Sequence, residues 1–209
     1  MNRLPFVLRL KPDMKDAGIA AISIAWDEIR ASLHALHMTN CSVWSIEDFL
    51  FFYGEYADGA DAPAADAVLM EIMAPYAELF AAPGTLPLMY HDIGIVRADK
   101  SLIRHRVFAT KLKDGCDEEY KARHDALIAA RDGSLRVGPE SNFTIWNANG
   151  YIFGYCELVR SFDHEKTEEE KQADIAWETR QLEIMDWLTD DVDWITGEKH
   201  DAIRLIGRG

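Results

Sequence analysis

The stretch "PFVLRLK" at residues 5–11 returns in altered form as "VFATKLK" at residues 107–113, and this return decides how the chain is organised. A second pair lies at the same separation, with "NCSVW" at 40–44 and "NFTIW" at 142–146. Adding 102 to a position aligns both pairs without a gap over about fifty residues. Matches in one constant register indicate an internal duplication. We therefore divide the chain into two repeats, residues 1–98 and 99–209.

Both repeats show the same order of predicted elements, because stretches rich in β-forming residues alternate with stretches of helical periodicity. In the first repeat, strands and helices are expected at 5–11, 15–37 (helix), 40–45, 49–56, 64–80 (helix) and 88–96. In the second repeat, the corresponding ranges are 106–113, 117–131 (helix), 142–147, 151–158, 167–188 (helix) and 200–206. Asn149-Gly150 between two of these strands is a strong hairpin signal.

This βαββα order with a trailing strand predicts an α+β fold of two tandem ferredoxin-like units, each an antiparallel sheet with both helices on one face. The other face of such a sheet needs cover. We expect the two units to pack sheet to sheet as an internal pseudo-dimeric α+β barrel, with each trailing strand crossing to extend the partner's sheet. Such a chain is expected to be a monomer, and a further dimer stays open.

Composition and charge narrow the class of function. The hydrophobic share of 48% and the charged share of 28% are typical of a soluble globular protein. A net charge of −14 argues against nucleic acid as a partner, because binding phosphates needs a basic surface. The most apolar run, residues 18–26, is too short to span a bilayer, so no membrane association is expected. The N-terminal residues do not have the pattern of a signal peptide.

Cysteine and histidine usage points to a cytoplasmic protein without a metal site. Three cysteines are an odd number without paired spacing, which favours a reducing, cytoplasmic setting over a disulfide scaffold. The seven histidines do not form metal-ligand spacings with nearby carboxylates. We therefore expect no metal.

The segment "EEYKARHDAL" at 118–127 places Tyr120 and His124 four residues apart, on one face of a predicted helix. Taken alone, this pair is ordinary helix composition and is compatible with a solvated surface, with core or with the wall of an active site. The second repeat as a whole, however, resembles the L-rhamnose mutarotase family. The motifs that carry the resemblance are "VFATKLKDGCDEEYKARHDAL" (107–127), "NFTIW" (142–146), "YIFGYCEL" (151–158) and "RQLEIM" (180–185).

The resemblance implies an activity and a set of site residues. Members of this family interconvert the α and β anomers of L-rhamnose without a cofactor, so a small monosaccharide such as a 6-deoxyhexose is the implied partner. His124 matches the family's acid/base histidine and Tyr120 its sugar-contacting tyrosine. Asn142 matches an asparagine that follows this histidine after eighteen residues. As a candidate for substrate binding, Asn142 is expected to face the same cavity as His124. An asparagine stands at this position in both repeats, as Asn40 and Asn142, which favours a structural role at the strand entry.

Several positions depart from the family pattern. The family's tyrosine after the asparagine is Phe143 here, and Gln181 replaces an aromatic ring that would stack on the sugar. Gln181 either binds a sugar hydroxyl or points to water, and Trp177 or Trp187 could supply a stacking platform instead. Trp146 is a further candidate for substrate binding, but Trp44 holds the equivalent strand position in the first repeat, which favours core for both.

In the first repeat the positions of Tyr120 and His124 hold Gly18 and Ile22, so proton transfer is expected only in the second repeat. Trp26 of the first repeat matches a family tryptophan and is expected to be core, unless both repeats build one composite site. Three functions follow: a sugar mutarotase, a binding protein without turnover, or another cofactor-free enzyme on the same barrel, such as an oxygenase or lyase.

Overall fold

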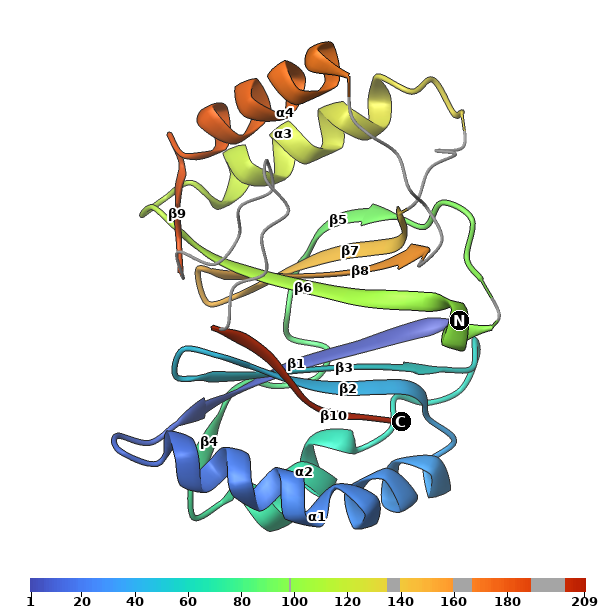
Figure 1. The fold of residues 1–209 in the computed structure, drawn as a ribbon, viewed down its shortest axis with the longest axis vertical. Coiled ribbons are helices and arrows are strands. Elements are labelled where there is room, and N and C mark those ends of the chain that lie inside the picture. The colour runs from blue at the N-terminus through green and yellow to red at the C-terminus, as the bar shows by residue number, and fades with distance from the viewer. Residues whose placement is uncertain (98, 135–139, 160–166, 189–201) are drawn as a thin grey trace. The chain divides into compact units, whose positions relative to one another are not determined.

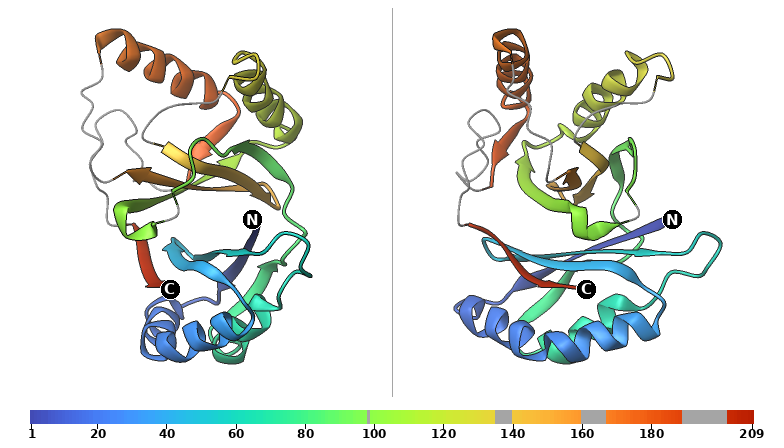
Figure 2. Two further views of the ribbon diagram at one scale, coloured as in Figure 1. Left: turned by 90° about the vertical axis from the view of Figure 1, so that its right-hand side faces the viewer. Right: turned by 45° about the vertical axis from the view of Figure 1, so that its right-hand side comes forward.

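The computed structural model describes residues 1–97, 99–134, 140–159, 167–188 and 202–209. It contains two five-stranded antiparallel sheets, each with two helices on one face (Figure 1). The two views of Figure 2 show the same layering in each unit, helices on one side and sheet on the other. The predicted α+β class with two ferredoxin-like units is therefore confirmed. None of the helices in the described ranges is long and apolar enough to cross a membrane.

The first sheet has the strand order β10-β2-β3-β1-β4. Its elements are β1 (Asn2–Leu10), α1 (Lys15–Ala35), β2 (Thr39–Ile46), β3 (Phe49–Tyr56), α2 (Ala65–Met73), β4 (Ala77–Ala81) and β10 (Ile203–Arg208). The second sheet has the order β5-β7-β8-β6-β9. Its elements are β5 (Leu88–Asp92), the short helix η1 (Lys100–Leu102), β6 (Ile103–Leu112), α3 (Asp117–Ala129), β7 (Glu140–Ala148), β8 (Tyr151–Val159), α4 (Glu168–Gln181) and β9 (Met185–Trp187).

Each trailing strand belongs to the sheet of the other repeat, as the sequence predicted. β5 pairs with β7, so that Tyr90 lies opposite Ile145, and β10 pairs with β2, so that Gly207 lies opposite Val43. The compact units are consequently residues 1–87 with 202–209 (unit 1) and 88–201 (unit 2). The boundaries of the compact units thus differ from the repeat boundary at residue 98, because each repeat gives its last strand away.

The second helix of each repeat is shorter than predicted. The sequence predicted helices over 64–80 and 167–188, but α2 ends at Met73 and α4 at Gln181, and the residues that follow form β4 and β9. These short strands pair with β1 and β6 at the edge of each sheet. Just past the end of each helix, a lysine ammonium donates hydrogen bonds to two backbone carbonyls. The Nζ of Lys11 bonds the carbonyls of Ala74 and Pro75, and that of Lys113 those of Leu182 and Glu183.

Backbone details also repeat between the halves. Asn40 and Asn142 both adopt a left-handed conformation, with φ of 50° and 51°, and both lie at a register shift of their strand. Asparagine tolerates this conformation better than most residues, which explains why it stands at both bulges. The left-handed pair Glu47 and Asn149 repeats in the same way, with φ of 52° and 54°. The duplication inferred from the sequence is thus visible in the backbone itself.

Candidate functional site

His124 lies on the sheet-facing side of α3 and is only 6% exposed. Its Nδ1 lies 2.9 Å from the carbonyl oxygen of Tyr120, one turn earlier on the helix. A carbonyl only accepts hydrogen bonds, so Nδ1 carries the proton and Nε2 holds the lone pair when the ring is neutral. Within the described residues, Nε2 has no hydrogen-bond partner. The helix therefore fixes the tautomer and leaves one nitrogen available for proton transfer.

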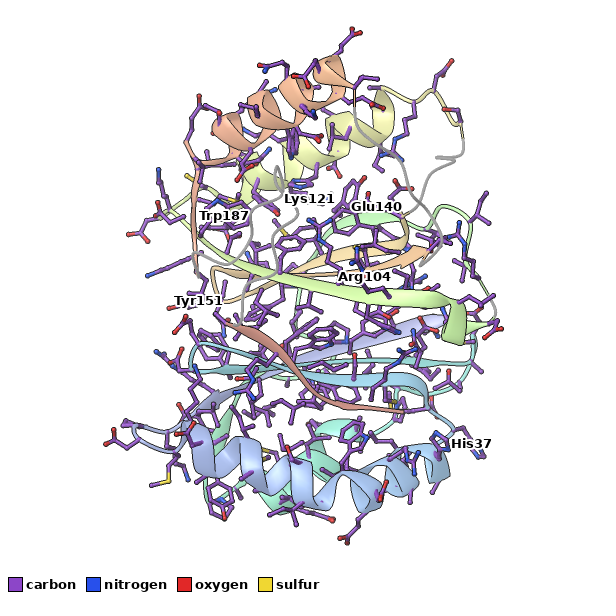
Figure 3. The ribbon with its side chains drawn as sticks, viewed as in Figure 1. His37, Arg104, Lys121, Glu140, Tyr151 and Trp187 are labelled. Carbon is purple, nitrogen blue, oxygen red and sulfur yellow. The ribbon has the colours of Figure 1, made fainter. Side chains whose placement is uncertain are left out.

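Aromatic rings surround this imidazole. The ring centroid of Tyr120 lies 4.3 Å from that of His124, and the rings of Tyr90 and Trp177 meet it edge-on at 5.3 Å and 5.4 Å. These rings come from three elements, α3, β5 and α4. Figure 3 labels Lys121 on α3 and Trp187 on β9 in the same unit, with side chains drawn between its helices and its sheet. Trp177, which the sequence offered as a stacking platform, is therefore part of the site.

Burial shifts the two titratable groups of α3 in opposite senses. Desolvation lowers the pKa of His124 below its usual range, although the hydrogen bond to the Tyr120 carbonyl and the charge of Asp125 act in the other direction. Desolvation raises the pKa of Tyr120 far above its usual range. At neutral pH the imidazole is thus uncharged and able to accept a proton, while the phenol stays protonated and able to donate a hydrogen bond.

A second polar group anchors Tyr90 beside His124. The guanidinium of Arg131, just past the end of α3, donates to the hydroxyl of Tyr90 at 3.0 Å and also bonds the carboxylate of Asp92. Asp92 is buried on the same strand as Tyr90, two residues on, and accepts a hydrogen bond from its hydroxyl at 3.3 Å. This ion pair joins the end of α3 to β5 and so holds the ring of Tyr90 against the imidazole.

Buried polar atoms without partners lie in the same layer. The side-chain amide of Gln181 is 2% exposed, and neither its oxygen nor its nitrogen has a hydrogen-bond partner among the described residues. The hydroxyl of Thr110 on β6 is equally buried and unpaired there. Thr110 stands between Phe108 and Leu112, which pack against Tyr120, and side chains two apart on a strand share a face. Buried polar groups are nearly always paired, so these atoms need partners that the described residues do not supply.

Unit 1 shows what the same layer contains without such a site. The positions of Tyr120 and His124 are Gly18 and Ile22, and the lysine bonds that end each helix align Gln181 with Met73. Ile22 and Met73 are fully buried in an apolar cluster. A Cβ added to Gly18 would lie 2.8 Å from Leu10 and 3.1 Å from Met73. Apolar side chains therefore fill the space that the tyrosine occupies in unit 2.

Two of the predicted site residues lie elsewhere. Asn142, which was expected to face the same cavity as His124, bonds the buried carboxylate of Glu157 at 3.1 Å. Glu157 alternates in direction with the residues of β8 that pack against Tyr120, so it lies on the opposite face of the sheet. Asn40 bonds Glu55 in unit 1 at 3.0 Å in the same way, so the pair belongs to both copies. The structure does not bring Asn142 to the imidazole.

Trp146 also lies apart from His124, whereas Phe143 packs against Tyr90, one of the rings around the imidazole. Trp146 is 4% exposed and neighbours Ile145, which packs against Tyr120, so its side chain points to the opposite face of β7. Phe143 packs edge-on against Tyr90, at 5.3 Å between ring centroids, and thus belongs to the aromatic layer. The structure brings together His124, Tyr120 and Phe143 in this layer. Gln181 joins them because it stands one turn after Trp177 on the same face of α4.

The contacts of Trp26 bear on the composite-site alternative. Trp26 packs over Gly207 and donates from Nε1 to the carbonyl of Arg208 at 3.0 Å, so its contacts are in unit 1. The first repeat instead contributes Tyr90 and Asp92 through its exchanged strand. Sequence reasoning missed these residues because no periodic signal links a trailing strand to a helix of the other repeat. The predicted strand exchange was the one signal that could have led to them.

Metal ligation has no support from the residues that the structure describes, since they contain no group of three or more His, Cys, Asp or Glu side chains placed to hold an ion. The cysteines Cys41, Cys116 and Cys156 are all free thiols. Besides the ion pair of Arg131 and Asp92 that holds Tyr90, the layer around His124 therefore offers an imidazole, a phenol, an amide and a hydroxyl. These groups suit proton transfer and the binding of an uncharged, hydroxyl-rich molecule.

Residues 105–202 match the model of the L-rhamnose mutarotase family. The resemblance predicted from the motifs of the second repeat is thus confirmed over that range, which is slightly less than half of the chain. The range includes His124 and Gln181 but not Tyr90. A search of curated proteins found no match.

Two solved structures are similar at low identity, both described as candidate monooxygenases. One, from Fusobacterium nucleatum subsp. nucleatum, shares 9% identity over 90% of this chain and 93% of its own, with a TM-score of 0.44. The other, from Lactobacillus acidophilus NCFM, shares 9% identity over 100% of this chain and 98% of its own, also with a TM-score of 0.44. Likeness at this level informs neither the topology nor the activity.

Proposed function

We propose that unit 2, whose sequence matches the L-rhamnose mutarotase family, is a sugar mutarotase that interconverts α and β anomers by opening and closing the pyranose ring. The family match supports the reaction class, and the state of His124 supports the chemistry. Ring opening removes a proton from the anomeric hydroxyl and delivers one to the ring oxygen. A neutral imidazole with one available nitrogen can perform both transfers in turn.

The proposed sequence of steps uses the groups of α3. The Nε2 of His124 takes the proton of the anomeric hydroxyl while that oxygen forms a carbonyl and the bond from the anomeric carbon to the ring oxygen breaks. The phenol of Tyr120, kept protonated by its burial, donates a hydrogen bond to the oxygen that gains charge. The imidazolium then protonates the ring oxygen. Rotation about the bond to the carbonyl carbon followed by the reverse steps gives the other anomer, with no net change in protons.

The observation that carries this proposal is the contrast between the two units. Unit 2 buries an imidazole, a phenol and an unpaired amide. At the equivalent positions, unit 1 has Ile22, Gly18, whose free space is occupied by neighbouring apolar side chains, and Met73. One fold is thus built twice, once with a closed apolar layer and once with a layer that contains costly polar groups. Buried polar groups that the fold does not need favour a function at that place.

Saturation-transfer NMR between the anomeric protons of L-rhamnose tests the proposal. We expect exchange well above the rate in buffer for the wild type, and a loss of about 10²- to 10⁴-fold for His124→Gln, the usual contribution of a positioned acid or base. Glutamine keeps most of the side-chain volume, so the fold should persist. His34→Ala, at an exposed histidine of α1, is the matched control and should leave exchange unchanged.

Two outcomes would contradict the proposal in different ways. If the wild type exchanges the anomers of L-rhamnose and related 6-deoxy sugars no faster than buffer, the enzymatic proposal fails and a binding protein without turnover takes its place. If exchange is fast and His124→Gln retains it, the reaction class stands and the assignment of the imidazole is wrong.

A further inference from the structure

The amide of Gln181 is a candidate recognition group, because it has both kinds of hydrogen-bonding capacity and uses neither with the described residues. Its oxygen accepts and its nitrogen donates, and both atoms are buried. The residue ends α4, where the backbone turns into the edge strand β9. Its own carbonyl accepts the N–H of Ile184 at 2.9 Å, so its backbone is fixed and its side chain is the part left unpaired.

Gln181 is connected to His124 through Trp177, which lies beside it on α4. Trp177 stands four residues earlier on the same face of α4, and its ring meets the imidazole edge-on at 5.4 Å. Thr110, with its own unpaired hydroxyl, pairs in register with Trp187 of β9, the strand that directly follows Gln181. The amide and the hydroxyl thus flank the layer that holds the imidazole.

Unit 1 shows that the fold does not require these polar groups. Met73, a side chain of similar length, occupies the position of Gln181, and Leu8 occupies that of Thr110. Both are fully buried among apolar neighbours. The fold is therefore satisfied by apolar residues at both positions, and the polar residues of unit 2 need another explanation.

We propose that the carboxamide of Gln181 binds two adjacent hydroxyl groups of the sugar, one donating to Oε1 and the other accepting from Nε2, with the Thr110 hydroxyl bonding a third oxygen. This inference rests on the proposed function and specifies its substrate class: a pyranose recognised along its polar edge through a vicinal diol. An aromatic ring at this position would instead stack on the C–H face of the sugar. Removing either hydroxyl of the diol leaves half of the buried amide unpaired, which weakens binding on the order of 5- to 100-fold.

The test combines ligand and protein changes in one cycle. The probes are L-rhamnose and its 2-deoxy, 3-deoxy and 4-deoxy analogues, and affinity is measured by NMR titration of wild type and Gln181→Met. For the wild type we expect two analogues that lack hydroxyls on neighbouring carbons to bind on the order of 5- to 100-fold more weakly than L-rhamnose. For Gln181→Met we expect weaker binding of L-rhamnose and no difference between it and those two analogues.

Thermal unfolding without sugar separates a recognition role from a structural one. Methionine is the residue that unit 1 uses here, so Gln181→Met should unfold at the same temperature as the wild type or higher. A lower unfolding temperature together with unchanged affinity for L-rhamnose would overturn the proposal, as would equal affinity of the wild type for all four probes or the absence of binding by all of them. If the expected affinity pattern appears without anomer exchange, the mutarotase proposal fails and the diol site stands.

Discussion

The ring of Tyr90, on the last strand of the first repeat, meets the ring of His124, on the first helix of the second repeat, edge-on at 5.3 Å. The two residues come from different copies of the duplicated sequence, yet they lie in one compact unit because β5 joins the second sheet. The candidate site is therefore composite by strand exchange. The part of the chain that matches the family model begins at residue 105, so Tyr90 lies outside that part.

Tyr90 should position the imidazole rather than take part in proton transfer. Tyr90→Leu removes the ring that packs against His124, and we expect anomer exchange to fall about tenfold while the NMR titration midpoint of His124 moves. Tyr90→Phe keeps the ring and removes only the hydroxyl bonded by Arg131, so its effect should be smaller. Equal losses in the two variants, with no change in the titration of His124, would argue against a positioning role.

The rate of anomer exchange should depend on pH through His124. Because burial lowers its pKa below the usual value of 6.5, the neutral form that accepts a proton already dominates at about pH 6.5 and at every higher pH. We expect the rate to be flat from about pH 6.5 upward and to fall only under more acidic conditions. Exchange rates measured from pH 4.5 to 8 check this profile. An activity limb centred well above pH 6.5 would contradict it.

The same pKa shift makes stability depend on pH. In the unfolded chain His124 binds a proton as the pH falls through about 6.5, whereas in the folded protein it resists protonation until a lower pH. Acid therefore favours unfolding, and the loss should begin near pH 6.5 and grow until the folded pKa is reached. Urea unfolding at pH 7 and pH 5 measures the loss. It should be smaller for His124→Gln, in which this group no longer titrates.

Restoring the histidine in unit 1 should not create a second site. Ile22→His places an imidazole in an apolar cluster where neither Tyr120 nor the amide of Gln181 has a counterpart. Burying an unpaired polar ring should lower the free energy of unfolding by about 1–3 kcal/mol and add no exchange activity. Introduced into His124→Gln, the change should leave the protein inactive. Recovery of exchange in that double variant would show that unit 1 can also bind the sugar.

Gly207 should be intolerant of any side chain. A Cβ there would lie 2.2 Å from the indole of Trp26, which packs over this glycine in β10. Gly207→Ala should destabilise the protein by about 1–3 kcal/mol, because the ring or the strand must shift. Trp26→Leu removes the obstacle, so the two changes together should cost less than their sum. Thermal unfolding of the two single variants and the double variant measures this coupling.

The sequence repeat predicted the shared framework but not the whole site. The constant offset of 102 located the first strand, the first helix and the hairpin in both copies, because the first helix and the hairpin's second strand begin at equivalent positions, although α1 has 21 residues and α3 has 13. The offset of 102 does not hold at the end of the second helix. The lysine bonds there make Met73 equivalent to Gln181, which lies further along the chain than the offset would place it. The sequence pattern also extended the second helix of each repeat into the apolar residues that follow it. The bonds from Lys11 and Lys113 that mark the end of each helix are long-range contacts, which a local pattern does not contain.

Asn142 shows why a spacing that matches a family does not fix a role. Its distance in sequence from His124 suggested one shared cavity. In the structure, Asn142 instead adopts the left-handed backbone conformation of the bulge, and its side chain donates to the buried carboxylate of Glu157. The pairing of His124 with Tyr90 had the opposite problem. It depends on the exchange of β5, which the sequence predicted, but the predicted strand did not show which of its side chains would meet the helix of the other repeat.

Strand exchange also sets an order of events during synthesis. Ile203–Arg208 emerge from the ribosome after all of unit 2, yet they form the edge of the sheet in unit 1, beside β2. Unit 2 meets no such delay, since its borrowed strand β5 is made before the rest of it. Until the last strand arrives, β2 presents an unpaired edge that other chains can join. The half of the protein that is synthesised first is thus the half whose sheet is completed last.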